Sequence, residues 1–338
     1  MDFLARYKYS GFLLLVLGLV AGYAAGQWGD KRGLSIIDQS LVPISEKGTS
    51  YAFVHPLLAY RVPEATVFGD YVSLKSSFQS IIDSEVSAHR VTKVALYFRD
   101  LDAARWVGIA QDDVFYPASL LKVPVLIAYL KEAEKNSSIL NKKIAYDPAV
   151  IPTESFTAPS TLVTSRDYTI KTLLNRMIID SDNGATFTLL NDVNPEFLRA
   201  VYTAIGIQDP GNGSTDYQIS ARSYGLFFRV LYNATYLSQA YSEQALRLLS
   251  QTTFVDGLVA GVPKGIVVAH KYGEHIFSEN GVATSLELSD CGIVYYPEHP
   301  YLLCVMTSAK GFAEASATIA KISSAAYDAI QQQYATAK

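Results

Sequence analysis

The order of hydrophobic patterns along the 338-residue chain constrains its fold more than any other feature. A helical periodicity comes first, strand patterns follow it, helical patterns fill the middle, and strand patterns return before a closing helix. The predicted elements are a helix at 71–89, strands at 91–98 and 106–109, helices at 119–133, 168–179, 185–191, 195–205 and 220–237, strands at 265–271, 283–288, 292–296 and 301–307, and a helix at 313–333. Because the strand patterns lie only in the first and last parts, we predict that these parts share one antiparallel sheet flanked by helices, while the middle forms an all-helical lobe. The predicted fold class is α/β of the α+β type, with a site between the sheet and the lobe.

The N-terminus has the pattern of a membrane segment. Arg6 and Lys8 precede an apolar run at 12–25, which together with its flanks is just long enough to span a bilayer. Because positive charge favours the cytoplasmic side, we predict a cytoplasmic stub and a transmembrane signal-anchor at 1–32. The chain is then a single-pass protein of the cell membrane, with the domain that follows the anchor outside the cytoplasm. The alternative is secretion after cleavage of a signal at the small residues 24–26.

Prolines and glycine interrupt residues 33–68, which are predicted to form a tether and the edge of a domain at 69–338. The net charge is -4 and no basic run is present, so nucleic acid is not an expected partner. The five histidines lack the spacing of metal-binding motifs, and no metal or other cofactor is expected.

The two cysteines, Cys291 and Cys304, flank a predicted hairpin whose turn centres on 297–298. They are therefore expected to face each other across two strands. We favour two small buried apolar side chains over a disulfide, which stays the alternative.

The first candidate for chemistry is Ser119, with Lys122 one helical turn later. Residues three apart on a helix share a face, so the amine can approach the hydroxyl. A serine needs a neighbouring base to become a nucleophile, and a lysine can serve when burial lowers its pKa. Alone, this S-x-x-K pattern is weak, because such tetrapeptides arise by chance.

Two further patterns follow in order. Ser181-Asp182-Asn183 lies between two predicted helices, where Ser181 can relay a proton and Asn183 can bind an amide. Lys271 lies near the end of a predicted strand, before Tyr272 and Gly273, and offers positive charge to a substrate carboxylate. Alone, the first pattern is also typical of a turn that caps a helix. The second is also typical of an ordinary exposed lysine before a glycine bend.

The ordered set, with intervals of 62 and 90 residues, resembles the S-x-x-K, S-D-N and K-T-G signatures of class A β-lactamases and penicillin-binding proteins. The likeness extends from roughly Phe78 to the C-terminus, so 69–338 is expected to be a serine β-lactamase-like catalytic domain. It implies that Ser119 forms an acyl-enzyme, that Lys122 assists its activation and that Ser181 shuttles a proton.

For substrate binding, the resemblance implies that Asn183 holds the substrate amide and that Lys271 supports the substrate carboxylate. The backbone N–H groups of Ser119 and Glu274, which follows Gly273, are implied to hold the oxyanion.

Two departures separate this chain from the class A pattern. The glutamate that activates water for deacylation has no evident equivalent. Glu196 is the only glutamate between Ser181 and Glu243 and lies at the start of an earlier helix, and Asp209 and Asp216 are the only acids of the short connection at 206–216. We interpret Asp216 as the cap of the helix at 220–237. Tyr272 replaces the small hydroxyl residue that contacts a substrate carboxylate in the family.

The predicted function is an extracytoplasmic serine acyl-hydrolase acting on β-lactams or related amides. The alternatives are a penicillin-binding D,D-peptidase or transferase acting on peptidoglycan peptides, and a binding protein without turnover.

Overall fold

The computed structural model describes residues 42–45, 51–61, 70–103, 105–150, 160–211, 216–280 and 282–335. The predicted signal-anchor at 1–32 and most of the predicted tether at 33–68 lie outside these residues. Among the helices in the described ranges, none combines the length and the apolar character that a membrane span needs.

The chain divides into two compact units, Met1–Val42 with Tyr60–Thr66, and Pro43–Ala59 with Val67–Lys338. Nearly all described residues belong to the second unit, and the sheet, the helices and the candidate site described below lie within it.

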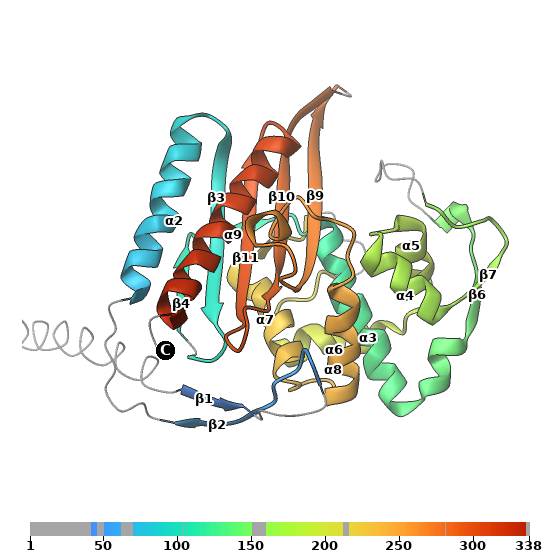
Figure 1. Cartoon of the computed structure of the whole chain (residues 1–338). Helices are drawn as coiled ribbons and strands as arrows, with labels where there is room; N and C mark the ends of the chain where they lie inside the picture. The colour runs from blue at the N-terminus through green and yellow to red at the C-terminus, as the bar shows by residue number, and fades with distance from the viewer. Residues whose placement is uncertain are drawn as a thin grey trace, which may run out of the picture. The chain divides into compact units, whose positions relative to one another are not determined.

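A five-stranded antiparallel sheet forms the centre of the second unit, in the order β4-β3-β11-β10-β9 (Figure 1). Its strands are β3 (Val91–Asp100), β4 (Trp106–Ile109), β9 (Val268–Glu279), β10 (Val282–Val294) and β11 (Tyr301–Ala309). The prediction that the first and last parts of the chain share one antiparallel sheet is therefore confirmed.

Helices cover both faces of this sheet (Figure 1). Helices α2 (Asp70–Ser87) and α9 (Phe312–Ala335) pack on one face, and α7 (Ala221–Tyr232) packs on the other. Alternate residues of each strand enter the two cores, as in β11, where Leu303 faces α9 and Met306 faces the helical lobe. Burial on both faces explains why the strands are almost continuously apolar.

The middle of the chain forms the predicted helical lobe. Its helices are α3 (Lys122–Lys135), α4 (Ile170–Ile179), α5 (Asn183–Asp192), α6 (Pro195–Ile205), α7 and α8 (Gln239–Leu249). Helix α3 is buried along almost its whole length, which fits its apolar sequence. The predicted α/β class with a separate lobe is confirmed.

Short elements complete the described chain. They are the 3-10 helices η1 (Ala118–Leu121), η2 (Ser137–Asn141), η3 (Pro148–Val150) and η4 (Val259–Gly261), and the strand pairs β1 (Val42–Ser45) with β2 (Leu57–Arg61), β5 (Val114–Phe115) with β8 (Ile219–Ser220), and β6 (Lys143–Ala145) with β7 (Asp167–Thr169).

Several predicted boundaries are wrong, each for a local reason. The helix expected at 220–237 ends at Tyr232, because the chain turns through Ala234 with a positive φ of 48°. Its N-cap is Ser220, whose hydroxyl accepts from the Ser223 N–H, and Asp216 is exposed and lies outside the cap. Helix α8 was not predicted, although Ser238 caps it and is a typical start signal.

The residues of the second unit that precede α2 pack against its helices. Val54 is fully buried, the Phe53 N–H donates to the Glu243 carboxylate at 2.7 Å, and the His55 N–H donates to the Tyr232 carbonyl at 2.9 Å. This segment therefore belongs to the edge of the domain that contains α7 and α8.

Cys291 and Cys304 face each other across β10 and β11, as the sequence predicts, with Cα atoms 3.9 Å apart. They form a disulfide, so the favoured interpretation of two free apolar side chains is wrong. Both are fully buried on the face of the sheet that meets the helical lobe.

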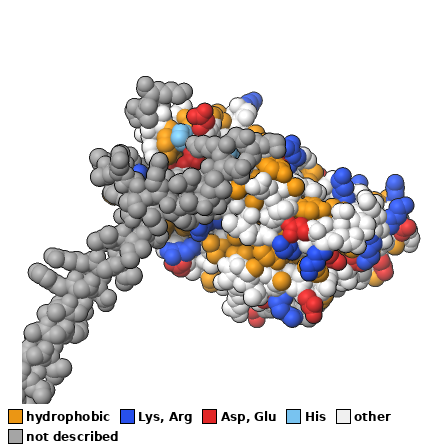
Figure 2. All heavy atoms as spheres, turned by 90° about the horizontal axis from the view of Figure 1, so that it is seen from below, with side chains coloured by type: hydrophobic (Ala, Val, Ile, Leu, Met, Phe, Trp, Pro, Cys, Tyr) orange, Lys and Arg blue, Asp and Glu red, His pale blue; other side chains and the backbone are white. Residues whose placement is uncertain are grey.

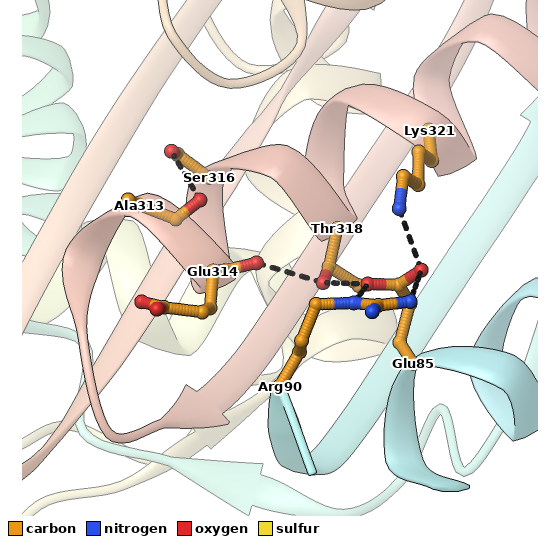
Figure 3. A network of polar contacts seen from close by, with 7 residues as sticks. All are labelled: Glu85, Arg90, Ala313, Glu314, Ser316, Thr318 and Lys321. Carbon is orange, nitrogen blue, oxygen red and sulfur yellow. Dashed lines mark hydrogen bonds and ion pairs between the residues drawn. The ribbon is translucent and has the colours of Figure 1, made fainter. Parts of the chain in front are cut away.

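An ionic cluster ties the end of α2 to α9 (Figure 3). The Glu85 carboxylate accepts from the Arg90 guanidinium at 2.5 and 2.8 Å and from the Lys321 amine at 2.7 Å. Its side chain is only 3% exposed, whereas its two partners are 41% and 50% exposed. The hydrogen bonds from Arg90, together with Lys321, outweigh the effect of burial and lower the pKa of Glu85 to about 2.

We expect Glu85→Gln to lower the free energy of unfolding at pH 7 by about 1 to 3 kcal/mol, because the buried ion pairs are lost. The folded-state pKa lies below the ordinary value, so the carboxylate stabilises the fold above about pH 4. That contribution is lost as the pH falls toward 2. Denaturant unfolding of wild type and variant at pH 7 and pH 3 measures both effects.

The matched control is Glu314→Gln, which removes an exposed carboxylate on α9 and is expected to change stability by less than about 1 kcal/mol. A difference for Glu85→Gln that is the same at both pH values would contradict the assigned role of its charge.

Candidate active site

Ser119 lies in η1, the single 3-10 turn that leads into α3. The preceding Ala118 has a φ of 46°, a region that L side chains avoid and that costs roughly 1 to 3 kcal/mol. The predicted helix at 119–133 is therefore a tight turn followed by an α-helix that starts at Lys122. This arrangement leaves Ser119 half-buried at the end of the lobe's central helix.

The second pattern is a turn between α4 and α5. Ser181 has a φ of 55°, and Asp182 caps α5 by accepting from the Ala185 N–H. The Asp182 carboxylate also accepts from the Ser160 hydroxyl at 2.8 Å and from the Thr161 N–H at 3.0 Å. These donors outweigh burial and lower the pKa of Asp182, so an ionised carboxylate fixes the turn.

The three patterns meet at the Ser181 hydroxyl. It donates to the Ser119 hydroxyl at 3.2 Å, and it accepts from the Lys122 amine at 2.9 Å and the Lys271 amine at 3.0 Å. Lys122 also donates to the Ser181 carbonyl at 2.6 Å and to the Asn183 side-chain oxygen at 2.8 Å. The hydrogen bonds of Lys122 thus run to Ser181 and Asn183, and Ser181 links it to Ser119.

Both amines are removed from water. Lys122 is 3% exposed and Lys271 is 0% exposed. Burial lowers the pKa of Lys122 to about 7, although Asp182 opposes the shift. Burial and the nearby Lys122 together lower the pKa of Lys271 well below its usual range, against the attraction of Asp290. A lysine whose pKa is near neutrality can act as a base.

Strand β9 brings the third pattern close to Ser119. The strand continues through Lys271 to Glu279, so the prediction that Lys271 lies near a strand end is wrong. Gly273 explains why the strand can pass so close to η1: a Cβ atom at this position would lie 2.4 Å from the Pro117 carbonyl oxygen and 3.1 Å from the Leu120 nitrogen. Gly273 is buried, and the following Glu274 is exposed.

Tyr272, which lies between Lys271 and Gly273 on β9, is at the rim of the site. Its ring centroid is 4.2 Å from the Lys271 amine nitrogen, and its ring stacks on Phe254 at 4.0 Å. Burial raises the pKa of the Tyr272 phenol, although a hydrogen bond with the Ser181 side chain lowers it. The structure therefore places a neutral phenol against Ser181 and Lys271.

The acids that precede α7 lie elsewhere. Glu196 and Asp216 are exposed, and Asp209 pairs with Arg199 on α6 at 3.5 Å. None of these three contacts Ser119, Lys122 or Ser181 through a described hydrogen bond or ion pair. Among the described residues, no three His, Cys, Asp or Glu side chains gather as a metal site requires. On the face seen in Figure 2, the basic and acidic side chains that are visible are interspersed.

Sequence reasoning missed Asp290. It is fully buried on β10, lies 2.7 Å from the His270 imidazole and accepts from the Leu258 N–H at 2.8 Å. The two strands predicted at 283–288 and 292–296 are one continuous strand, β10. It can continue through Asp290 because the hydrogen-bond partners of this buried carboxylate satisfy it inside the core. The available signal was an acid directly before the apolar residues Cys291, Ile293 and Val294.

Two other residues support the turn that contains Ser119. The Tyr224 hydroxyl, from α7, donates to the Leu120 carbonyl at 2.9 Å. The Tyr116 N–H donates to the Glu287 carboxylate, from β10, at 2.8 Å. They tie η1 to the lobe and to the sheet, and nothing in their sequence context singles them out.

Because a Cβ at Gly273 would overlap the Pro117 carbonyl, we expect Gly273→Ala to push β9 away from Ser119. If Ser119 forms an acyl-enzyme, as the resemblance implies, the rate of its acylation by benzylpenicillin should fall by about 10². Ser278→Ala, an exposed change on the same strand, is the control and should leave the rate unchanged. Rapid-quench mass spectrometry gives the rates, and wild-type acylation by a folded Gly273→Ala variant would contradict the assigned contact.

Solved structures share this architecture. PBP-A is 23% identical, with a TM-score of 0.63 over 76% of this chain and 96% of that chain. A β-lactamase from Chitinophaga pinensis DSM 2588 is 21% identical, with a TM-score of 0.64 over 75% and 99%. The TLA-1 extended-spectrum β-lactamase is 18% identical, with a TM-score of 0.66 over 77% and 99%.

Comparison with curated proteins gives no significant match. The model of the β-lactamase enzyme family matches residues 74–330, which include all three patterns and all five strands of the central sheet. The resemblance inferred from the sequence is confirmed, and the chain belongs to the β-lactamase enzyme family.

Proposed function

We propose that this chain is an extracytoplasmic serine acyl-hydrolase that forms an acyl-enzyme at Ser119 with β-lactams or related amides. The observation that supports it most is the Ser181 hydroxyl, which contacts the Ser119 hydroxyl and the amines of Lys122 and Lys271. Family membership supports a serine β-lactamase-like hydrolase in general. The segment at 1–32 would anchor the enzyme in the membrane.

In the acylation step, the Ser119 oxygen attacks the amide carbonyl carbon while its proton passes through the Ser181 hydroxyl to the neutral Lys122 amine. The backbone N–H groups of Ser119 and Glu274 would hold the resulting oxyanion. When the C–N bond breaks, the proton on Lys122 returns through Ser181 to the leaving nitrogen. The products are the Ser119 ester and a free amine, and Lys122 is again neutral.

Deacylation needs a water and a base that deprotonates it. Glu196, Asp209 and Asp216 have no described contact with the site, so we expect the acyl-enzyme to hydrolyse slowly. One similar structure, a mutant of PBP-A, is an acyl-enzyme complex with penicillin G. Because none of these three acids has a described contact with the site, transfer of the acyl group to an amine is favoured over transfer to water, since an amine acceptor needs less activation. This supports the transferase form of the second candidate, a penicillin-binding D,D-peptidase or transferase on peptidoglycan peptides.

Acylation is expected to depend on pH through Lys122. Its neutral form is the base, so the second-order rate of acylation should rise with pH, with a midpoint near the pKa of about 7, and then level off. Stopped-flow measurement from pH 5 to 9 gives the profile. Lys122→Arg keeps a cation but removes the base, and its profile should lack this rise; an unchanged midpoint in this variant would exclude Lys122 as the titrating group.

Incubation with benzylpenicillin tests the nucleophile. We expect an adduct of one penicillin per chain that persists for hours on the wild type, and none on Ser119→Ala, because the ester forms at the Ser119 oxygen. Intact-mass spectrometry of the full chain in detergent gives the result. Rapid loss of penicillin without a lasting adduct would indicate a β-lactamase that uses another base. If no adduct forms and no penicillin is hydrolysed, the proposal is rejected.

A further inference from the structure

The acceptors described for the Lys122 amine all come from the turn between α4 and α5. The amine donates to the Ser181 carbonyl at 2.6 Å, to the Ser181 hydroxyl at 2.9 Å and to the Asn183 side-chain oxygen at 2.8 Å. The two carbonyl oxygens can only accept, whereas the hydroxyl can also donate. When Lys122 is neutral, its two N–H groups therefore point to the carbonyl oxygens, and its lone pair faces the Ser181 hydroxyl.

This orientation is the one that proton transfer requires. In the proposed function the lone pair takes the proton of the Ser181 hydroxyl, which in turn takes that of the Ser119 hydroxyl, 3.2 Å away. The positions of the Ser181 carbonyl and the Asn183 amide thus direct the base at its relay. Because Asp182 lies between these two residues in the chain, whatever holds Asp182 also sets their positions.

Two residues from outside the three patterns hold Asp182, and we call them the clasp. The Ser160 hydroxyl donates to its carboxylate at 2.8 Å, and Thr161 donates through its N–H at 3.0 Å and through its hydroxyl at 3.1 Å. A Cβ atom at Gly184 would lie 2.6 Å from the Ser160 Cβ, so the clasp lies directly against the turn. Ser160 and Asp182 are 22 residues apart, and no motif joins them.

The clasp also connects Asp182 to a positive charge. The Arg176 guanidinium, on α4, donates to the Thr161 hydroxyl, which donates to the Asp182 carboxylate. The hydroxyl therefore links a cation to a carboxylate that is only 5% exposed. Without this link, the negative charge of Asp182 would act more strongly on its surroundings.

The titratable groups near the Lys122 amine come from the turn and from the sheet. Asp182 raises the pKa of Lys122, in opposition to burial. On β9, Lys271 shares the Ser181 hydroxyl with Lys122, and the neutral Tyr272 phenol lies beside it. Asp182 is therefore the anion whose charge acts on Lys122 most directly.

We propose that Ser160 and Thr161 are positioning residues for the base Lys122. By holding Asp182, they direct the lone pair of the amine at Ser181 and limit the negative charge that the amine experiences. Neither residue has a described contact with Ser119 or Lys122. The inference rests on the proposed function, because it takes Lys122 to be the base of acylation.

Thr161→Val tests this role, because it keeps the shape of an exposed side chain and removes its hydroxyl. The second-order rate of acylation by benzylpenicillin is measured from pH 5 to 9 by rapid-quench mass spectrometry of the full chain in detergent. We expect the plateau at high pH to fall about tenfold, because the base is less well oriented. The midpoint should rise by roughly half a pH unit or more, because a less neutralised Asp182 favours the charged amine.

Two further variants give the direction of the charge effect. Ser160→Ala removes another donor to Asp182 and should also raise the midpoint. Asp182→Asn removes the anion itself, so the neutral amine is favoured and the midpoint should fall.

Thr161→Ser keeps the hydroxyl and should retain the wild-type midpoint, as should Thr164→Val, an exposed change nearby. Circular dichroism during thermal unfolding establishes that each variant is folded. A lower plateau with an unmoved midpoint in both Thr161→Val and Ser160→Ala would mean merely structural support, and it would overturn the inference while the proposed function stands. The same holds if both variants acylate like the wild type. If benzylpenicillin does not acylate the wild type at Ser119, both proposals fall.

Discussion

Two buried amines share one serine hydroxyl, and the rest of the site depends on this arrangement. Lys122 comes from the core helix of the lobe, Lys271 from the edge strand of the sheet, and Ser181 from the turn that Asp182 fixes. Two ammonium groups cannot both stay charged so close together in a buried place. Burial lowers the pKa of both lysines, so the fold favours the neutral form of at least one of them near pH 7, whereas a free lysine in water is charged.

Much of this architecture could be predicted from local patterns. The strand and helix periodicities place the sheet and the lobe, and the order of Ser119, Ser181 and Lys271 predicts that they converge. The roles assigned to them stay predictions, because the structure establishes where the side chains lie and not what they do. The transmembrane segment at 1–32 also stays a prediction.

Other features depend on contacts between residues far apart in sequence. Asp290 interrupts an apolar pattern, yet its partners His270 and Leu258 make it compatible with a buried strand. The stacking of Tyr272 on Phe254 joins residues from a loop and a strand, and no spacing rule relates them. The position of Gly273 in the middle of a strand can be understood only once the Pro117 carbonyl is seen beside it.

The disulfide has a consequence for how the strands behind the site find their partners. Cys291 pairs with Lys271 on one side and with Cys304 on the other, so the covalent bond lies in the row of residues that carries the buried amine. Strands that are apolar on both faces distinguish poorly between neighbouring alignments, since a slip by one residue still buries hydrocarbon. Once oxidised, this pair admits a single alignment of β10 with β11. The disulfide thus fixes the correct pairing of these strands covalently, and it can do so only in a compartment where thiols are oxidised.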